Sequence, residues 1–276
     1  MYLCPVCKAP LAQKSGGLGC EQGHSFDRSR KGYVNLLLSH RMKSRQPGDS
    51  KEMIEARSAF LSAGYYRPLV EALAAVCQRY DVGHLLDAGC GEGYYASELA
   101  RRGVNVAGTD ISKAGIVAAC RRDKNPAWCI ASISDLPYET GYFDAVLSVF
   151  SLVDEAQFIR VLKPGGIVIF VGPGEDHLPA LRAGLYESVR PYKSDKPDRY
   201  FTRLQDIERQ TLRFPLALEE RSAIEQLLKM TPHYWNTNLT QHERLFAQAP
   251  LTDTADMQIR VYRRDSDPVT PSDLSL

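Results

Sequence analysis

The sequence predicts an α/β protein whose main domain is a doubly wound, mostly parallel sheet, preceded by a small separate module. Short apolar segments alternate with helical ones from His84 onward, as in parallel sheets covered by helices on both faces. A glycine-rich loop follows the first apolar segment, and a cluster of cysteine and histidine lies ahead of this pattern, within the first 24 residues.

The cluster consists of Cys4, Cys7, Cys20 and His24, in the spacing C-x2-C-x12-C-x3-H. Two such pairs, joined by a short hairpin, complete a tetrahedron around one ion, and four ligands without an open position indicate a structural Zn²⁺. A disulfide is the alternative. The opening residues "MYLCPVC" show no secretory pattern, so we expect a reducing, cytoplasmic location instead.

The composition is that of an ordinary globular protein, with 44% hydrophobic and 24% charged residues. No stretch approaches membrane-spanning length, so no membrane partner is expected. The net charge of +1 divides into +5 for residues 1–50 and −4 for the remainder. This asymmetry favours a polyanionic partner held at the N-terminal end; a merely solubilising surface is the alternative.

We expect four segments: a zinc-binding module over 1–38, a basic linker over 39–50, the main domain over 51–265 and a flexible tail over 266–276. The first two helices of the main domain are expected over 51–61, capped by Asp49 or Ser50 and stopped by Gly64, and over 65–80. Strands are then expected at 84–89, 104–110, 127–132, 144–150, 165–172, 211–218 and 257–264, and further helices at 94–103, 112–122 and 220–230.

The glycine loop reads "LLDAGCGEGYY" and contains Gly89, Gly91 and Gly93 directly after a strand. Glycine permits a tight turn and a close approach of a ligand to the backbone. Asp110 ends the next strand, where a carboxylate accepts hydrogen bonds from ribose hydroxyls. Together, the glycine loop and Asp110 predict a site for an adenosine-type cofactor. The alternative is that the loop is only a tight βα turn.

Two carboxylates narrow the choice of cofactor. Asp87 precedes the loop and Glu92 lies inside it, and both suit a ligand with an ammonium and a sulfonium better than one with a pyrophosphate. The phosphate-binding pattern G-x-x-x-x-G-K-[ST] does not occur in the sequence.

The motifs "LLDAGCGEGYY", "GTDIS", "SDLPYETGYFDAVLS" and "RVLKPGG" resemble those of class I S-adenosyl-L-methionine-dependent methyltransferases. That resemblance implies a seven-stranded sheet with one antiparallel strand near an edge. The zinc clip, followed by "GYVNLLL", "PGDS" and "AFLSAGYY", is similar to the bacterial 23S rRNA guanine-N1 methyltransferases, to about Arg264.

The resemblance implies roles for particular residues. The four clip residues match zinc ligands, Gly93 and Tyr94 match the cofactor loop, and Asp110 matches the ribose-binding acid. Tyr66 and His177 match residues at the cofactor pocket. From the residues alone, Tyr66 could equally pack between helix and sheet, and His177 could begin a helix.

One position departs from the pattern of class I enzymes. Many of them carry an acid after the third strand, where it contacts the adenine amino group. Here Ser132 occupies that place.

Transfer to guanine N1 requires loss of the N1 proton, so a general base or an acceptor network is expected. The weak candidates are Asp154, Glu155 and His177, among which the sequence does not choose. Phe150 could stack on a base or belong to the core. The segment "SVFSLVD" lacks the proline motif that often accompanies methylation of exocyclic amines.

The expected partner is a hairpin of 23S rRNA, whose target guanine is exposed in a loop or flipped out. The zinc-binding module would grip phosphates through its basic residues, which are Arg28, Arg30, Lys31, Arg41, Lys43 and Arg45. The sequence does not decide whether the protein forms a homodimer. The alternatives are a small-molecule methyltransferase with a structural zinc cap and a non-catalytic RNA-binding protein.

Overall fold

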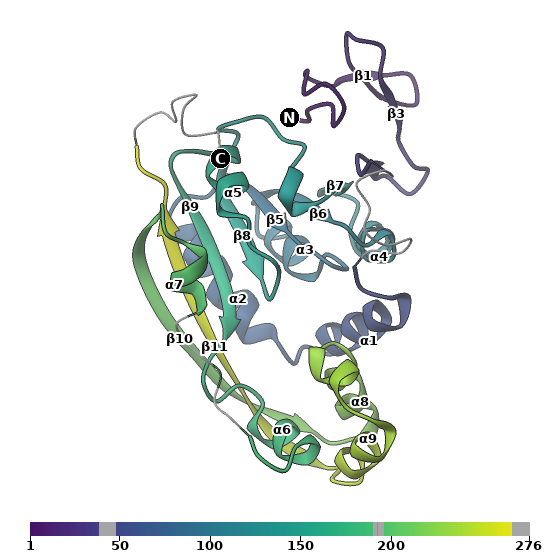
Figure 1. The fold of residues 1–276 in the computed structure, drawn as a ribbon, viewed down its shortest axis with the longest axis vertical. Helices are drawn as coiled ribbons and strands as arrows, with labels where there is room; N and C mark the ends of the chain where they lie inside the picture. Colours follow the sequence, from purple (N-terminus) through teal and green to yellow (C-terminus); the bar gives the residue numbers. More distant parts are fainter. Residues whose placement is uncertain (39–47, 190–191, 193–195, 267–276) are drawn as a thin grey trace.

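The computed structural model describes residues 1–38, 48–189, 192 and 196–266. Its central element is an eight-stranded sheet with the strand order β10-β11-β9-β8-β5-β6-β7-β4 (Figure 1). The six strands β4 to β9 are parallel to one another. These parallel strands are β4 (Val34–Asn35), β5 (His84–Ala88), β6 (Asn105–Asp110), β7 (Ala127–Ile130), β8 (Phe143–Val149) and β9 (Leu162–Pro173).

The other edge of the sheet is a long antiparallel pair. Strand β11 (Leu251–Arg263) is antiparallel both to β9 and to β10 (Gln205–Leu218), which confirms one antiparallel strand near an edge. The prediction that β10 begins at residue 211 was wrong. Residues 205–210 are polar except for Ile207 and show no apolar alternation, yet this segment pairs with the end of β11.

The seven predicted strands are present, and a short eighth strand joins them. Val34 pairs with Cys129 and Asn35 with Ile130, so β4 extends the sheet beyond β7. Two residues are too few to show a strand pattern in the sequence. The segment predicted as a separate module therefore contributes to the main sheet.

Helices cover both faces of the sheet, because its strands are apolar on both sides. Leu85 and Leu147 belong to the core cluster on one face, and Leu86 and Val146 to the cluster on the other. The connections to the parallel strands contain α3 (Tyr94–Ala100), α4 (Lys113–Arg122), the 3-10 helix η2 (Ile133–Asp135) and α5 (Glu155–Val161).

Two helices precede the first strand of the main domain, α1 (Lys51–Ser62) and α2 (Arg67–Arg79). Ser50, rather than Asp49, caps α1: its side-chain oxygen accepts a hydrogen bond from the Met53 N–H at 3.2 Å. Gly64 has φ +88°, which ends α1 as predicted.

A group of helices lies at the end of the molecule opposite the N-terminal module (Figure 1). The predicted helix over 220–230 is confirmed as α8 (Arg221–Lys229), whereas its neighbours were not predicted. These neighbours are α6 (Pro179–Leu185), the 3-10 helix η3 (Pro232–Asn236) and α9 (Leu239–Phe246), and a further short helix, α7 (Lys196–Tyr200), lies against the long strands.

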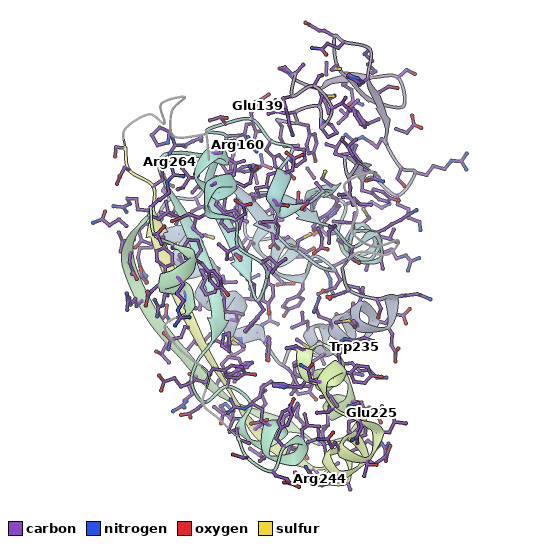
Figure 2. The ribbon with its side chains drawn as sticks, in the orientation of Figure 1. Glu139, Arg160, Glu225, Trp235, Arg244 and Arg264 are labelled. Carbon is purple, nitrogen blue, oxygen red and sulfur yellow. The ribbon has the colours of Figure 1, made fainter. Side chains whose placement is uncertain are left out.

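The N-terminal module folds as three short antiparallel strands, β1 (Ala12–Lys14), β2 (Gly17–Gly19) and β3 (Ser25–Asp27). It is docked on the segment that follows η2. The Leu3 N–H donates to the Pro137 carbonyl at 2.9 Å, and Lys8 forms an ion pair with Asp135 at 2.5 Å. Figure 2 labels Glu139, which binds the N-terminal amino group at 3.0 Å beside this module.

Most of the predicted linker, residues 39–47, and nearly all of the predicted tail, residues 267–276, lie outside the described residues. Arg41, Lys43 and Arg45 are among them. In the described part of the chain, every helix is too short or too polar to cross a lipid bilayer.

Candidate active site and zinc centre

The four predicted metal ligands come together in the N-terminal module. The ligand atoms of Cys4, Cys7, Cys20 and His24 all lie within 4.8 Å of one another. The sulfurs of Cys7 and Cys20 are 3.6 Å apart, and the Cys20 sulfur is 3.3 Å from His24 Nδ1. Zinc–sulfur bonds of about 2.3 Å in a tetrahedron require separations of this size, so the cluster fits Zn²⁺.

Backbone hydrogen bonds preform the two ligand turns. The Lys8 N–H donates to the Cys4 carbonyl at 2.8 Å, with Lys8 at φ +61°, and the Cys20 N–H donates to the His24 carbonyl at 3.0 Å. Gly23, at φ +87°, provides the left-handed residue of the second turn. Since both turns are local, the spacing in the sequence was sufficient to predict the centre.

The glycine loop lies where β5 ends, between the ends of β6 and β8. A Cβ on Gly89 would lie 2.6 Å from Ser151 Cβ, and one on Gly93 would lie 2.5 Å from the Trp128 ring. Both glycines have positive φ. They are required by the turn and by the packing of the loop against its neighbours.

Asp110 ties this loop to the end of β6. One carboxylate oxygen accepts from the Gly91 N–H at 2.9 Å and the other from the Ser112 N–H at 2.7 Å. The structure thus brings the predicted loop and the predicted acid together at the carboxyl edge of the sheet, where open α/β sheets bind ligands.

Two further carboxylates are buried beside the loop. Asp87 and Glu92 are each 2% exposed, and each has one side-chain oxygen without a hydrogen-bond partner among the described residues. Burial raises the pKa of Asp87 to about 8, and the negative charges of Asp110 and Glu92 add to the effect. Buried carboxylates with unused acceptors fit a ligand that carries positive charge and hydroxyl groups.

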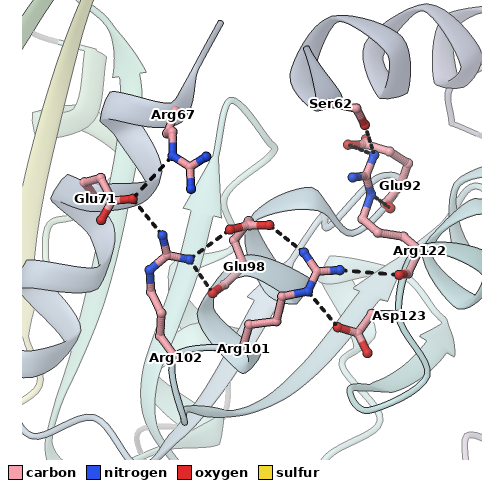
Figure 3. Close-up of polar contacts among 9 residues, drawn as sticks. All are labelled: Ser62, Arg67, Glu71, Glu92, Glu98, Arg101, Arg102, Arg122 and Asp123. Carbon is pink, nitrogen blue, oxygen red and sulfur yellow. Dashed lines mark hydrogen bonds and ion pairs between the residues drawn. The ribbon is translucent and has the colours of Figure 1, made fainter. Parts of the chain in front are cut away.

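Two arginines from neighbouring helices brace the loop. Arg57 of α1 pairs with Asp49, and its Nη1 would lie 3.2 Å from a Cβ on Gly91. Arg122 of α4 donates to the Glu92 carbonyl at 3.3 Å and to Ser62 of α1 at 3.2 Å (Figure 3).

Neither arginine was predicted to have a role. Arg57 lies in the predicted helix that follows "PGDS", but only the fold shows that its side chain reaches the glycine loop. Figure 3 also shows an ion-pair network that links α2, α3 and the C-cap of α4 through Glu71, Glu98, Arg101, Arg102 and Asp123.

The two tyrosines implied by the resemblance are both buried. Tyr66 lies before α2, with its ring edge-on to Phe60 and Phe214, and Tyr94 begins α3 under the guanidinium of Arg122, 5.3 Å from the ring centroid. These contacts put the Tyr66 ring between α1 and β10, and its role at the cofactor pocket stays a prediction.

Phe150 is the exposed aromatic residue at the carboxyl end of β8. It is 44% exposed and has φ +50°, a left-handed conformation that is unfavourable for a residue with a bulky side chain. The next residue, Ser151, donates to the Ala88 carbonyl at 2.8 Å and so fixes this turn against the glycine loop. The core alternative for Phe150 was wrong, because the residue is exposed rather than buried in the core.

The His177 ring packs against the Phe150 ring, with the two ring centroids 5.6 Å apart. Its Nδ1 accepts a hydrogen bond from the Asp256 N–H at 3.2 Å. Burial lowers the pKa of His177 to about 4. The ring is therefore neutral near pH 7, with its proton on Nε2.

The two acidic candidates for a general base have other partners. The carboxylate of Asp154 caps α5 by accepting from the Gln157 N–H at 3.0 Å, and Glu155 accepts from Thr202 and from the Arg203 N–H. Ser132 caps η2, its hydroxyl accepting from the Ser134 N–H at 3.3 Å.

The fold and the two sites define a class I S-adenosyl-L-methionine-dependent methyltransferase with an N-terminal zinc ribbon. Residues 86–170 match the family model described as a methyltransferase domain, and residues 2–45 match the one described as RlmA, N-terminal. The YcgJ protein from Bacillus subtilis shares the fold, with a TM-score of 0.50, 16% identity, and coverage of 72% of this chain and 98% of that chain.

Two relatives match over nearly the whole chain. "Putative 23S rRNA (guanine-N(1)-)-methyltransferase YxjB" of Bacillus subtilis (strain 168) is 34% identical, covering 95% of this chain and 96% of the relative. The 23S rRNA (guanine(748)-N(1))-methyltransferase of Streptomyces fradiae is 31% identical, covering 90% of each. The chain belongs to the 23S rRNA (guanine-N1)-methyltransferase family.

Proposed function

We propose that this chain transfers the methyl group of S-adenosyl-L-methionine to N1 of a guanine in a hairpin loop of 23S rRNA. The observation that carries this proposal is the exposed ring of Phe150, held by a strained, left-handed backbone beside the glycine loop. The names of the full-length relatives support the choice of guanine N1 and of 23S rRNA.

The cofactor supplies a methyl group on a positively charged sulfur, which leaves as a neutral thioether. In our proposal Gly89, Gly91 and Gly93 admit the cofactor to the loop backbone and Asp110 accepts from its ribose. Asp87 balances its positive charge, while Tyr66, Tyr94 and His177 border the pocket. With Ser132 in place of an acid, the adenine would meet a hydroxyl rather than a carboxylate.

Phe150 would hold the target guanine by stacking, with N1 facing the methyl group. A new N1–C bond forms as the S–C bond breaks, and the N1 proton leaves to solvent or to an acceptor. When N1 loses its proton, negative charge spreads to O6. His177, neutral with Nε2–H, is suited to donate a hydrogen bond to that oxygen rather than to act as the base.

The zinc ribbon would position the RNA. Lys14, Arg28, Arg30 and Lys31 are exposed on it, and it is docked against residues 135–139, close in sequence to Ser132. A substrate of this kind places the enzyme in the cytoplasm. Sedimentation of the purified protein will show whether it acts as the homodimer that the sequence left open.

The decisive experiment maps methylated guanines in rRNA from cells with and without the gene. We expect one N1-methylguanine of 23S rRNA to disappear and to return with the wild-type gene. An unchanged rRNA would refute the function and favour a small-molecule substrate. In vitro, Phe150→Ala should lower kcat/KM for RNA about tenfold or more while cofactor affinity stays unchanged, whereas Phe150→Tyr keeps the ring and most of the activity.

A further inference from the structure

A cavity of about 340 Å³ lies between α6, the residues that follow it and η3. Its lining consists of Arg182, Tyr186, Ser188, Val189, Tyr192 and His233. It is separate from the glycine loop and Asp110, and nothing in the proposed reaction uses it.

The lining combines aromatic surface with positive charge. The Arg182 guanidinium, 5% exposed, lies over the Tyr192 ring, 4.6 Å from its centroid, and donates to the His177 carbonyl at 3.1 Å. Among the described residues, six line the cavity, and none of these six is acidic. A cavity of this kind favours a planar, anionic ligand over a cation.

Hydrogen bonds hold the aromatic walls in position. The hydroxyl of Tyr186 is 3.0 Å from Nδ1 of His233, and that of Tyr192 is 2.8 Å from Nε2 of the same ring. Burial lowers the pKa of His233, and the charge of Arg182 adds to the effect. The neutral imidazole therefore donates to one tyrosine and accepts from the other, which fixes both rings.

The cavity is connected to the target site by a row of rings, which we call the aromatic row: Phe150, His177, Tyr192, His233 and Tyr186. Their successive centroids are 5.6, 6.4, 6.4 and 5.6 Å apart. Neighbouring rings are tilted by 30° to 68°, and aromatic side chains are surfaces on which unpaired bases stack.

We propose that the cavity binds the nucleotide next to the target guanine in the unpaired RNA loop, with its base against Tyr186 and Tyr192 and its phosphate toward Arg182. This inference rests on the proposed function, in which Phe150 holds the guanine. The cavity then selects unpaired RNA, because a neighbour stacked in a duplex could not enter it.

The test pairs enzyme variants with altered RNA. The RNA is a hairpin containing the target guanine, and an abasic nucleotide replaces its 5′ or its 3′ neighbour. We expect Tyr192→Ala to raise KM for the intact hairpin about tenfold, and one of the two abasic hairpins to raise KM for the wild-type enzyme similarly. When Tyr192→Ala is tested on that abasic hairpin, KM should rise little beyond the value for either change alone. Both changes remove the same stacking interaction.

Controls separate this interaction from a loss of folding. Tyr200→Ala removes an exposed tyrosine on α7, outside the cavity, and should leave KM unchanged. Ser188→Trp, at an exposed lining residue, fills the cavity without opening the core and should raise KM as Tyr192→Ala does. All variants should bind S-adenosyl-L-methionine with wild-type affinity in calorimetry.

Two outcomes would overturn the inference. If the wild type methylates the hairpin but Tyr192→Ala and Ser188→Trp leave KM unchanged, the cavity does not bind RNA. If the effects of Tyr192→Ala and of both abasic changes simply add, the cavity does not bind a neighbouring base. A wild type without activity on guanine N1 would overturn the proposed function as well.

Discussion

The carboxylate of Asp110 accepts a hydrogen bond from the Gly91 N–H at 2.9 Å and thereby joins the end of β6 to the glycine loop. Asp110 is the last residue of β6, and Gly91 lies in the connection between β5 and α3. Their hydrogen bond holds the loop at the edge of the sheet where we propose that the cofactor binds.

Asp110→Ala should therefore weaken binding of S-adenosyl-L-methionine. The loop loses its anchor and the ribose loses its acceptor, at a cost of about 1–3 kcal/mol, or roughly 5-fold to 150-fold in Kd. Isothermal titration calorimetry measures the change. Glu55→Ala, on the exposed side of α1, serves as the control and should bind normally. Unchanged affinity in Asp110→Ala would mean that the cofactor lies elsewhere.

Loss of the zinc centre should disturb the main domain as well as the ribbon. We expect about one Zn²⁺ per wild-type chain and none in Cys20→Ser. Because Leu3 and Lys8 dock the ribbon on residues 137 and 135, the variant should also unfold at a lower temperature. Metal analysis and thermal denaturation check both points.

Cys120→Ala is the control for the zinc centre. It changes a buried cysteine of α4 and should keep its metal. A metal-free wild type with an ordered N-terminal ribbon would contradict the assignment.

Asp87 should make the cofactor-free protein progressively less stable as the pH rises from about 4 to about 8. Its folded pKa is raised to about 8, whereas the unfolded value is about 4. Between these values the folded protein binds more protons than the unfolded chain, so the free energy of unfolding falls as pH rises through this window. Asp87→Asn should reduce that fall, by at most about 1.4 kcal/mol per pH unit.

Urea denaturation at pH 5 and pH 8 measures this effect. The variant should gain stability relative to the wild type at pH 8 more than at pH 5. Asp81→Asn, at an exposed residue with φ +50°, is the matched control and should follow the wild type. Parallel pH profiles for Asp87→Asn and the wild type would show that Asp87 ionises normally.

The basic residues of the N-terminal segment should determine the salt dependence of RNA binding. Replacing Arg41, Lys43 and Arg45 together by alanine should weaken binding to any RNA. It should also reduce the slope of log K against log salt by roughly 0.7–0.9 for each phosphate that the variant no longer neutralises. Cofactor affinity should stay the same. Fluorescence anisotropy at several salt concentrations measures the slope.

A second triple variant, outside the N-terminal segment, is the control for charge alone. It replaces Arg209, Arg221 and Lys229, which lie on β10 and α8. An equal loss of RNA affinity in both triple variants would indicate a general charge effect and remove the gripping role from the N-terminal segment.

The sequence by itself determined the zinc centre, the glycine loop with Asp110 and the parallel core of the sheet. Each depends on a local pattern. A ligand turn spans a few residues, a positive φ favours glycine at one position, and alternation along a strand reports burial on two faces.

Only the tertiary structure decided which side chains meet at the carboxyl edge. Asp256 reaches His177 from a strand 79 residues later and decides which ring nitrogen carries the proton. The exposure of Phe150 follows from the turn that Ser151 fixes against Ala88. Arg182 and His233, which are far apart in the sequence, both line the cavity. Such arrangements depend on how distant elements pack, and no local pattern in the sequence encodes that packing.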